Sequence, residues 1–335
     1  MNEAAALAIE APAKVNLGLR VGGRRADGYH LIESLFVPLE LADRLRVALR
    51  PRRTAETERV SLSVGGERAA GVPSGASNLA ARAAAAFLDA AERTDLGAEI
   101  RLEKRIPAEA GLGGGSSDAG AVLRGLAALL PGALAPEPLA ALALRLGADV
   151  PFFLDPRPAI VRGIGEQIGP APALAPLDLL LVRPAHGLST AAVYAAFDDA
   201  AGALTARGPG PTVRPPEGPL APEALARLLE NDLEPAAVRL CPALLRLRRR
   251  IAAAGALAVG MSGSGPTLFG VFANEAAAAR AAAQMDEMGE QTGGEDGPAE
   301  GPGLWIRVTR TVTAPKPAVR VPLGPGPSDG ASPNW

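Results

Sequence analysis

The chain has 335 residues, enough for about two ordinary domains, and 48% of them are hydrophobic, so it can bury a sizeable core. Its formal net charge is −2 and no basic stripe stands out, which argues against a dedicated nucleic-acid-binding protein. The single cysteine, Cys241, excludes an intramolecular disulfide and a cysteine-based metal cluster.

The first half of the chain alternates between strand patterns and helical patterns. Apolar side chains recur at every second position in 14–21, which predicts a strand. Further strands are predicted at 45–50, 60–66 and 98–106. Helices are predicted at 77–91, capped by Ser77 or Asn78, at 119–130, and at 136–147, which ends at Gly147.

A segment rich in proline and glycine, at about 156–175, predicts a boundary between two domains. The second half mixes strands and helices, as in a smaller α+β domain. The strands are predicted at 178–184, 267–272 and 304–312, and the helices at 223–231, 242–255 and 274–288. Three stretches have the composition of loops or tails: 205–219, 289–303 and 314–335. We therefore expect domains at 1–165 and 166–318 and a flexible tail at 319–335.

The N-terminal segment MNEAAALAIEAPAK lacks the basic region and the long apolar run of a secretory signal. No apolar run reaches the length of a membrane span. We expect a cytoplasmic protein with no membrane partner.

The sequence GLGGGSSDAG, at 111–120, places four glycines before two serines and an aspartate. A glycine loop that leads into a helix points free N–H groups at one spot, where the helix dipole also favours negative charge. A serine-capped turn is the simpler alternative, but one or two glycines would suffice for it. The run therefore favours a loop that binds an anion such as phosphate.

The glycine run at 111–115 does not match the patterns of two common phosphate-binding loops. The P-loop pattern G-x-x-x-x-G-K-[ST] is absent. The spacing of Gly111, Gly113 and Ser116 is close to a dinucleotide-binding fingerprint, which needs an acidic residue at the end of the next strand. Glu137 has about the right separation, but it lies between two prolines at the start of a predicted helix.

Three stretches resemble, in order and separation, the three motifs of the GHMP kinase superfamily: APAKVNLGLRV (11–21), PAEAGLGGGSSDAG (107–120) and MSGSGPTLF (261–269). Within the superfamily the chain is similar to the 4-diphosphocytidyl-2-C-methyl-D-erythritol kinase family. That similarity includes RADGYH (25–30), LGADVPFF (146–153) and NDLEP (231–235), and it covers roughly residues 8–315.

The resemblance implies an α+β fold of two domains. The first is an α/β domain like domain 2 of ribosomal protein S5, which carries the phosphate loop, and the second is ferredoxin-like. The implied activity is transfer of the ATP γ-phosphate to the 2-hydroxyl of 4-diphosphocytidyl-2-C-methyl-D-erythritol, on the non-mevalonate route to isoprenoid precursors. Mg²⁺ is expected to accompany ATP. We expect a monomer or weak homodimer with a small-molecule substrate and no nucleic-acid partner.

Phosphoryl transfer needs positioning, charge stabilisation and a group that takes the hydroxyl proton. The resemblance implies that Asp149, before Pro151 in an apolar segment, is this base, and that Lys14 orients it and stabilises negative charge. The simpler alternatives are an aspartate that bonds its own backbone at a helix end and an ordinary surface lysine.

The resemblance also implies the binding residues. Tyr29 would stack on the cytosine and His30 would bond its edge, with Asn16 beside them and Tyr194 as a second stacking face. The turn of Gly263, Ser264 and Gly265 would lie against the substrate phosphates. No metal-binding carboxylate is identified, and Ser116, Ser117 or water would suffice. The expected ATP-binding residues are Pro107, Ala108, Glu109, Ala110, Gly111, Leu112, Gly113, Gly114, Gly115, Ser116, Ser117, Asn78 and Lys104.

Three other functions fit the sequence less well. A homoserine or mevalonate-type GHMP kinase has no reason to carry the RADGYH loop, because its substrate has no cytosine. A dinucleotide-binding oxidoreductase leaves Lys14 and Asp149 without a role. A non-catalytic regulator built on the same fold would be expected to lose one of these two residues, and this chain has both.

Overall fold

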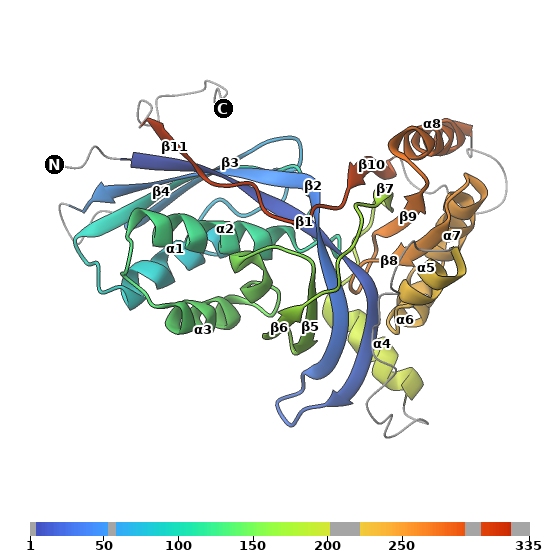
Figure 1. The fold of residues 1–335 in the computed structure, drawn as a ribbon, viewed down its shortest axis with the longest axis horizontal. Coiled ribbons are helices and arrows are strands. Elements are labelled where there is room, and N and C mark those ends of the chain that lie inside the picture. The colour runs from blue at the N-terminus through green and yellow to red at the C-terminus, as the bar shows by residue number, and fades with distance from the viewer. Residues whose placement is uncertain (1–4, 53–57, 202–221, 292–302, 323–335) are drawn as a thin grey trace.

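The computed structural model describes residues 5–52, 58–201, 222–291 and 303–322 (Figure 1). Two sheets organise them, and the chain passes from the first sheet to the second after residue 170. The strands β5 and β6 belong to the first sheet, so the boundary expected at 165 lies a few residues later. The expected two-domain α+β fold is confirmed.

The first sheet has the strand order β11-β1-β2-β4-β3, and β5 and β6 extend it from β2. All neighbours are antiparallel except β3 and β4, whose parallel pairing needs the crossover that helix α1 supplies. Its strands are β1 (Ala5–Arg24), β2 (His30–Pro51), β3 (Val60–Gly65), β4 (Leu96–Glu103), β5 (Ala159–Gly163), β6 (Gln167–Pro170) and β11 (Val319–Pro322).

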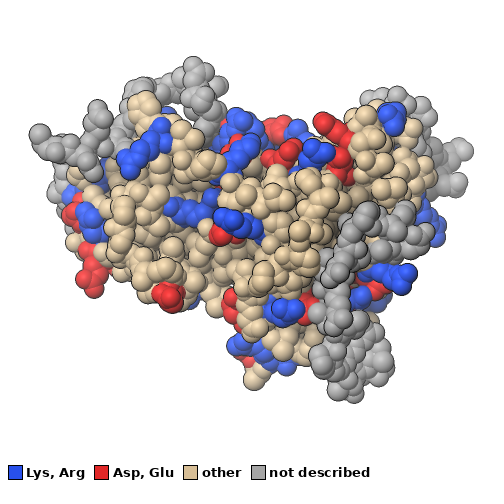
Figure 2. Space-filling view, in the orientation of Figure 1, with Lys and Arg blue, Asp and Glu red and all other residues tan. Residues whose placement is uncertain are grey.

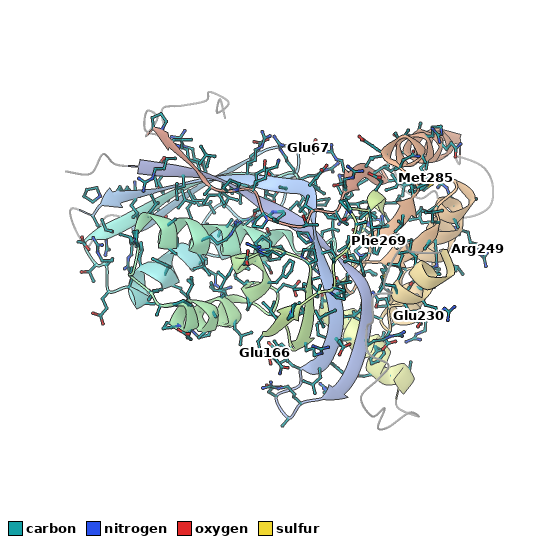
Figure 3. The ribbon with its side chains drawn as sticks, viewed as in Figure 1. Glu67, Glu166, Glu230, Arg249, Phe269 and Met285 are labelled. Carbon is teal, nitrogen blue, oxygen red and sulfur yellow. The ribbon has the colours of Figure 1, made fainter. Side chains whose placement is uncertain are left out.

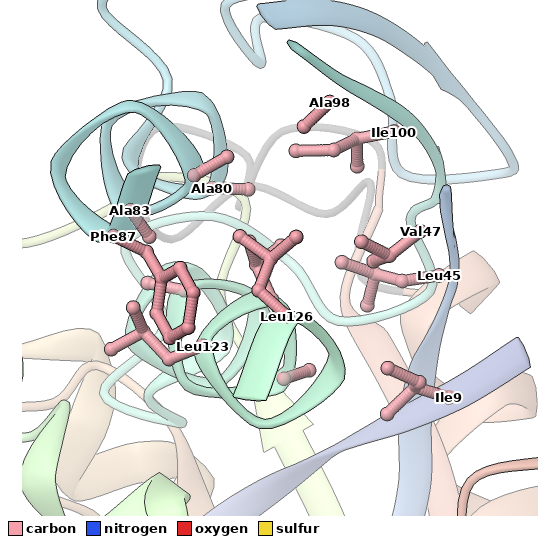
Figure 4. Packing of buried hydrophobic residues seen from close by; sticks show 14 of the residues in the cluster. Ile9, Leu45, Val47, Ala80, Ala83, Phe87, Ala98, Ile100, Leu123 and Leu126 are labelled. Carbon is pink, nitrogen blue, oxygen red and sulfur yellow. The ribbon is translucent and has the colours of Figure 1, made fainter. Parts of the chain in front are cut away.

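Helices α1 (Leu79–Ala90), α2 (Gly114–Leu129) and α3 (Pro136–Leu146) lie together on one face of this sheet (Figure 1). Figure 4 shows the core between them, in which Leu45 and Val47 of β2 and Ile100 of β4 face Phe87 and Leu123 of the helices. Most of their chain neighbours, such as Arg46 and Glu99, are partly exposed, as expected for a sheet with one covered face. The packing fixes the direction of α2, which begins at the glycine run.

The second sheet has the order β10-β7-β9-β8, with all pairs antiparallel. Its strands are β7 (Asp178–Arg183), β8 (Ala258–Met261), β9 (Leu268–Phe272) and β10 (Trp305–Arg310). The helices are α4 (Thr190–Ala201), α5 (Pro222–Leu228), α6 (Glu234–Leu240), α7 (Ala243–Ala253) and α8 (Glu275–Gln291). Helices α4 and α6 are not predicted by the sequence patterns described above.

The two sheets share a hydrophobic cluster. It joins Val15 and Leu17 of β1 to Leu179 and Leu181 of β7 and to Phe269 of β9. Figure 3 shows Phe269 in the interior between the two halves of the molecule. The cluster therefore holds the halves in a defined relative position, which any site built from both of them requires.

Part of the expected tail is ordered. Residues 319–322 form β11, which pairs with β1, so the prediction of a flexible tail over 319–335 is wrong for these four residues. Residues 323–335 and the predicted loop at 205–219 lie outside the described residues, as does most of the stretch 289–303. The residues 289–291 belong to helix α8.

Basic and acidic side chains are interspersed over the face seen in Figure 2, without a patch of one sign among the residues coloured there. In the described part of the chain, no helix combines the length and the apolar character needed to cross a lipid bilayer.

Candidate active site

A cleft of about 870 Å³ brings together segments from both halves of the molecule. Most of the predicted site residues line it. They are Lys14, Asn16, Asn78, Lys104, Pro107, Ala108, Glu109, Ala110, Gly111, Gly113, Gly114, Gly115, Ser116, Asp149, Tyr194, Gly263 and Ser264. Leu112 and Ser117 belong to the same loop and helix but are buried behind the lining, while Tyr29, His30 and Gly265 lie outside it.

The first part of the glycine run, 111–113, forms a tight loop that leads directly into helix α2, which begins at Gly114. Gly111 and Gly113 have φ angles of 72° and 70°, in the left-handed region that disfavours other residues. A Cβ at Gly111 would lie 2.3 Å from the carbonyl oxygen of Ser262, and one at Gly113 would lie 2.9 Å from the ring of Phe153. The first turn of α2 thereby presents its free N–H groups at the cleft, which suits a phosphate group.

Lys14 lies at an irregularity in strand β1. The pairing of β1 with β2 shifts register between Pro12 and Lys14. The backbone N–H of Lys14 donates to the carbonyl oxygen of Leu112 in the phosphate loop, at 3.0 Å. A bulge of this kind re-aims a residue at a sheet edge or an active site. Here it fastens the loop to β1.

The side chain of Lys14 is buried, 3% exposed, and has three neighbours. Its Nζ donates to Oδ1 of Asn16 at 2.6 Å, lies 3.6 Å from Oδ2 of Asp149, and lies 4.6 Å from the ring centre of Phe36. Burial lowers the pKa of Lys14, and the charge of Asp149 partly opposes this effect. The two residues expected to be catalytic are therefore neighbours, and the carboxylate remains 30% exposed to the cleft.

The second glycine turn packs on the first. Ser262 Oγ donates to the carbonyl oxygen of Gly111 at 2.8 Å. Asn231 Nδ2 donates to the carbonyl oxygens of Met261 and Gly263 at 2.9 and 2.8 Å, and Asn231 Oδ1 accepts from the amide of Leu233. Asn231 begins the NDLEP motif but is not among the predicted site residues. The amide side chain holds this turn in place.

The aromatic residues expected at the cytosine occupy different positions. The His30 ring stacks on the Tyr194 ring, with 5.0 Å between the ring centres, and His30 Nε2 lies 2.7 Å from Oδ1 of Asp198. Tyr29, at the turn between β1 and β2, is 58% exposed. Tyr194 reaches the cleft from α4, and burial raises its pKa to about 12, with a smaller contribution from Asp149.

Two predicted nucleotide contacts already have internal partners. Asn78 caps α1 by accepting from the amide of Ala80, and its Nδ2 donates to the carbonyl oxygen of Pro73. The ammonium of Lys104 lies between Asp43 and Asp118, two carboxylates that the sequence analysis did not assign. No group of three or more histidine, cysteine or acidic side chains that could hold a metal ion occurs among the described residues.

Comparison with known proteins identifies the family of the chain. The model of the GHMP kinases N terminal domain matches residues 78–155, and the GHMP kinases C terminal model matches 220–291. The chain is 44% identical to a 4-diphosphocytidyl-2-C-methyl-D-erythritol kinase of Anaeromyxobacter dehalogenans (strain 2CP-C) over 90% of both proteins. It is 40% identical to the enzyme of that name from Pelobacter propionicus (strain DSM 2379 / NBRC 103807 / OttBd1), over 84% of this chain and 95% of the relative.

Among solved structures, one of a 4-(cytidine 5'-diphospho)-2C-methyl-D-erythritol kinase is 40% identical, with a TM-score of 0.64 over 91% of this chain and 99% of the other. A homoserine kinase from Cytophaga hutchinsonii has a TM-score of 0.63 over 94% of this chain and 97% of its own, but only 17% identity, so it shares the fold alone. The chain therefore belongs to the GHMP kinases and, within them, to the 4-diphosphocytidyl-2-C-methyl-D-erythritol kinase family.

Proposed function

We propose that this chain transfers the γ-phosphoryl group of ATP to the 2-hydroxyl of 4-diphosphocytidyl-2-C-methyl-D-erythritol, giving the 2-phosphate and ADP, in the synthesis of isoprenoid precursors. The names of its close relatives support this reaction. The observation that carries the proposal is a single cleft that contains both an anion-binding loop and the Lys14–Asp149 pair. A phosphate donor and an alcohol acceptor need these two features side by side.

Asp149 takes the proton of the acceptor hydroxyl. Its carboxylate is partly exposed, whereas Lys14 behind it is buried, so the substrate reaches the carboxylate from the cleft. As the proton passes to Asp149, the hydroxyl oxygen bonds to the γ-phosphorus, and the bond from that phosphorus to the oxygen of ADP breaks. The Lys14 ammonium orients the carboxylate and stabilises negative charge that develops nearby.

The phosphates of ATP bind at the loop 107–117, where the N-terminus of α2 provides N–H groups and a favourable dipole. Ser117 Oγ is buried and has no hydrogen-bond partner among the described residues. Of the two serines only Ser116 lines the cleft, so its hydroxyl would offer an oxygen to a Mg²⁺ ion carried by ATP, since Mg²⁺ takes oxygen ligands and keeps several waters. When bound, Mg²⁺ neutralises charge on the β- and γ-phosphates.

The acceptor occupies the other part of the cleft, near Asn16, Tyr194 and the turn of Gly263, Ser264 and Gly265. The His30–Tyr194 stack marks one end of this region, and Tyr29 stands on the adjacent hairpin with its ring exposed. We propose that the cytosine binds here, because an exposed aromatic ring and a hydrogen-bonding histidine can read the face and the edge of a base.

A coupled ADP-release assay tests the function. The purified chain is given ATP and Mg²⁺ with one of three acceptors: 4-diphosphocytidyl-2-C-methyl-D-erythritol, homoserine or mevalonate. We expect ADP release with the cytidyl acceptor and little with the other two. Turnover with homoserine or mevalonate at a higher kcat/KM would overturn the assignment in favour of another GHMP kinase.

A further inference from the structure

Three buried ionisable side chains at the base of the cleft, next to the loop 107–117, have no part in the chemistry described above. Asp43 of β2 is 0% exposed, and Lys104 and Asp118 are each 3% exposed. Lys104 Nζ donates to Oδ2 of Asp118 at 2.8 Å and also to Oδ2 of Asp43. Burying ionisable side chains costs solvation free energy, which apolar side chains of similar volume would avoid.

Asp43 holds the segment that enters the loop. Strand β4 ends at Glu103, and the amide of Lys104 is the last to donate to the sheet, to the carbonyl oxygen of Gly65 at the end of β3. The next two amides need a partner elsewhere. Oδ1 of Asp43 accepts hydrogen bonds from the backbone N–H groups of Arg105 and Ile106, at 2.5 and 2.9 Å. One fully buried carboxylate thus binds two consecutive amides and the side chain of the residue before them.

Asp118 holds the segment that leaves the loop, because it lies in the second turn of α2. Lys104 therefore connects the entry of the loop, which Asp43 fixes, to the helix that follows it. Gly114, at the start of α2, lies so close that a Cβ there would be 3.4 Å from Lys104 Nζ. The two ends of the loop 107–113 are thus joined by a single ammonium group.

We infer that Asp43 is a positioning residue for nucleotide binding, which acts by holding both ends of the phosphate loop through Lys104 and Asp118. The inference rests on the proposed function, since it takes the loop to be the site of the ATP phosphates. A loop held at both ends has its N–H groups already directed at the ligand, so little ordering is left to be done when the nucleotide binds.

Asp43→Asn tests this inference, because it removes the charge while keeping an oxygen that can accept from the two amides. Binding of a nonhydrolysable ATP analogue with Mg²⁺ is measured by calorimetry, and the KM values for ATP and for the cytidyl acceptor are measured separately. We expect nucleotide affinity to fall by about tenfold, a loss typical of removing a group that supports a binding residue. The acceptor KM should stay within about twofold, and amides of 107–117 should exchange hydrogen faster in the free protein.

Asp178→Asn is the matched control. Asp178 is also a buried carboxylate, 8% exposed, but it pairs with Arg310 in the second sheet. This variant should lose stability without a change in nucleotide affinity. If Asp43→Asn does not fold, Asp118→Ala replaces it, with the same expected loss, because it removes the carboxyl group that Lys104 contacts. The two losses should be less than additive in the double variant, since both act through Lys104.

Two failures can be told apart. If the unmodified chain binds no nucleotide, the proposed function fails. The positioning role fails in a different way. The unmodified chain would then bind the analogue, and a folded variant would bind it equally well, with unchanged hydrogen exchange at the amides of 107–117. In that case the three side chains only support the fold.

Discussion

Lys14 Nζ lies 3.6 Å from Oδ2 of Asp149, and the two residues come from opposite ends of the first half of the chain. Lys14 is on strand β1, whereas Asp149 lies between helix α3 and the short 3₁₀ helix at Pro151–Leu154. The lysine is buried and the carboxylate is partly exposed. This difference in exposure gives the pair its direction, with the carboxylate toward the cleft.

Asp149→Asn should lower turnover by about 10²-fold or more, because asparagine cannot take the hydroxyl proton. The fold should remain intact, since the side chain is partly exposed and asparagine has the same shape. Single-turnover kinetics and thermal unfolding measure the two effects. Asp155→Asn is the control, because Asp155 is an exposed carboxylate nearby, paired with Arg157. Turnover of Asp149→Asn near that of the control would remove Asp149 from the role of base.

Gly111→Ala should weaken both the fold and nucleotide binding. The new Cβ would meet the carbonyl oxygen of Ser262 and would need a left-handed conformation that costs about 1–2 kcal/mol. Gly115→Ala is the control, since Gly115 lies in α2 with nothing within 4 Å of a new Cβ. In the nucleotide-free protein it should raise the free energy of unfolding by about 0.5–1 kcal/mol. Equal stability of the two variants in denaturant unfolding would contradict the close approach of the two loops.

Asn231→Asp should lower the free energy of unfolding by about 3 kcal/mol or more. It replaces an NH₂ group that donates to two carbonyl oxygens with an oxygen that repels them. Asn274→Asp is the matched control, because the side chain of Asn274 accepts a hydrogen bond from the amide of Ala277 at the start of α8 and donates none among the described residues. Aspartate serves equally well at such a helix cap. Urea unfolding measures the loss of unfolding free energy in both variants. A small loss in Asn231→Asp would show that the NH₂ group of Asn231 does not hold the turn.

Tyr29→Ala should raise the KM for the cytidyl acceptor while the KM for ATP changes little. The exposed ring contributes little to the fold, so the unfolding midpoint should not move. Steady-state kinetics with each substrate varied in turn separates the two KM values. An effect confined to ATP would place the cytosine in a different part of the cleft.

Asp118→Asn should become more stable relative to the unmodified chain as the pH rises. Burial, reinforced by the charge of Asp43, raises the pKa of Asp118 well above its usual value. The folded state therefore keeps the proton at pH values where the unfolded state has lost it. The unmodified chain then loses about 1.4 kcal/mol per pH unit, from about pH 4 up to the raised pKa, and the asparagine variant does not. The free energy of unfolding of both proteins, measured across this pH range, tests the prediction. A difference between the two proteins that does not change with pH would show that Asp118 ionises normally.

The sequence predicts some parts of this molecule and not others. The glycine run could be interpreted directly, because an ordinary turn does not need four glycines in five residues, although Gly114 and Gly115 belong to α2 and do not precede it. Strand β2 was predicted only in its second half, since Ser34 to Leu39 are all buried and a strand covered on both faces shows no alternation. The roles of Lys14 and Asp149 came from the resemblance, because nothing in their spacing brings them together.

The contacts of Asp43 and Asn231 could not be predicted at all. Each side chain binds backbone groups distant in sequence, and only the folded chain creates those pairs. Strand β11 was missed because its four residues follow a proline-rich stretch and form a strand only by pairing with β1.

That pairing has a practical consequence for anyone shortening the chain. Val319–Pro322 covers the outer edge of β1, next to the first residues that the structure describes. A deletion that removes everything after residue 318 would expose a bare row of backbone donors and acceptors, which invites association between molecules. Trimming for crystallisation should therefore stop after Pro322.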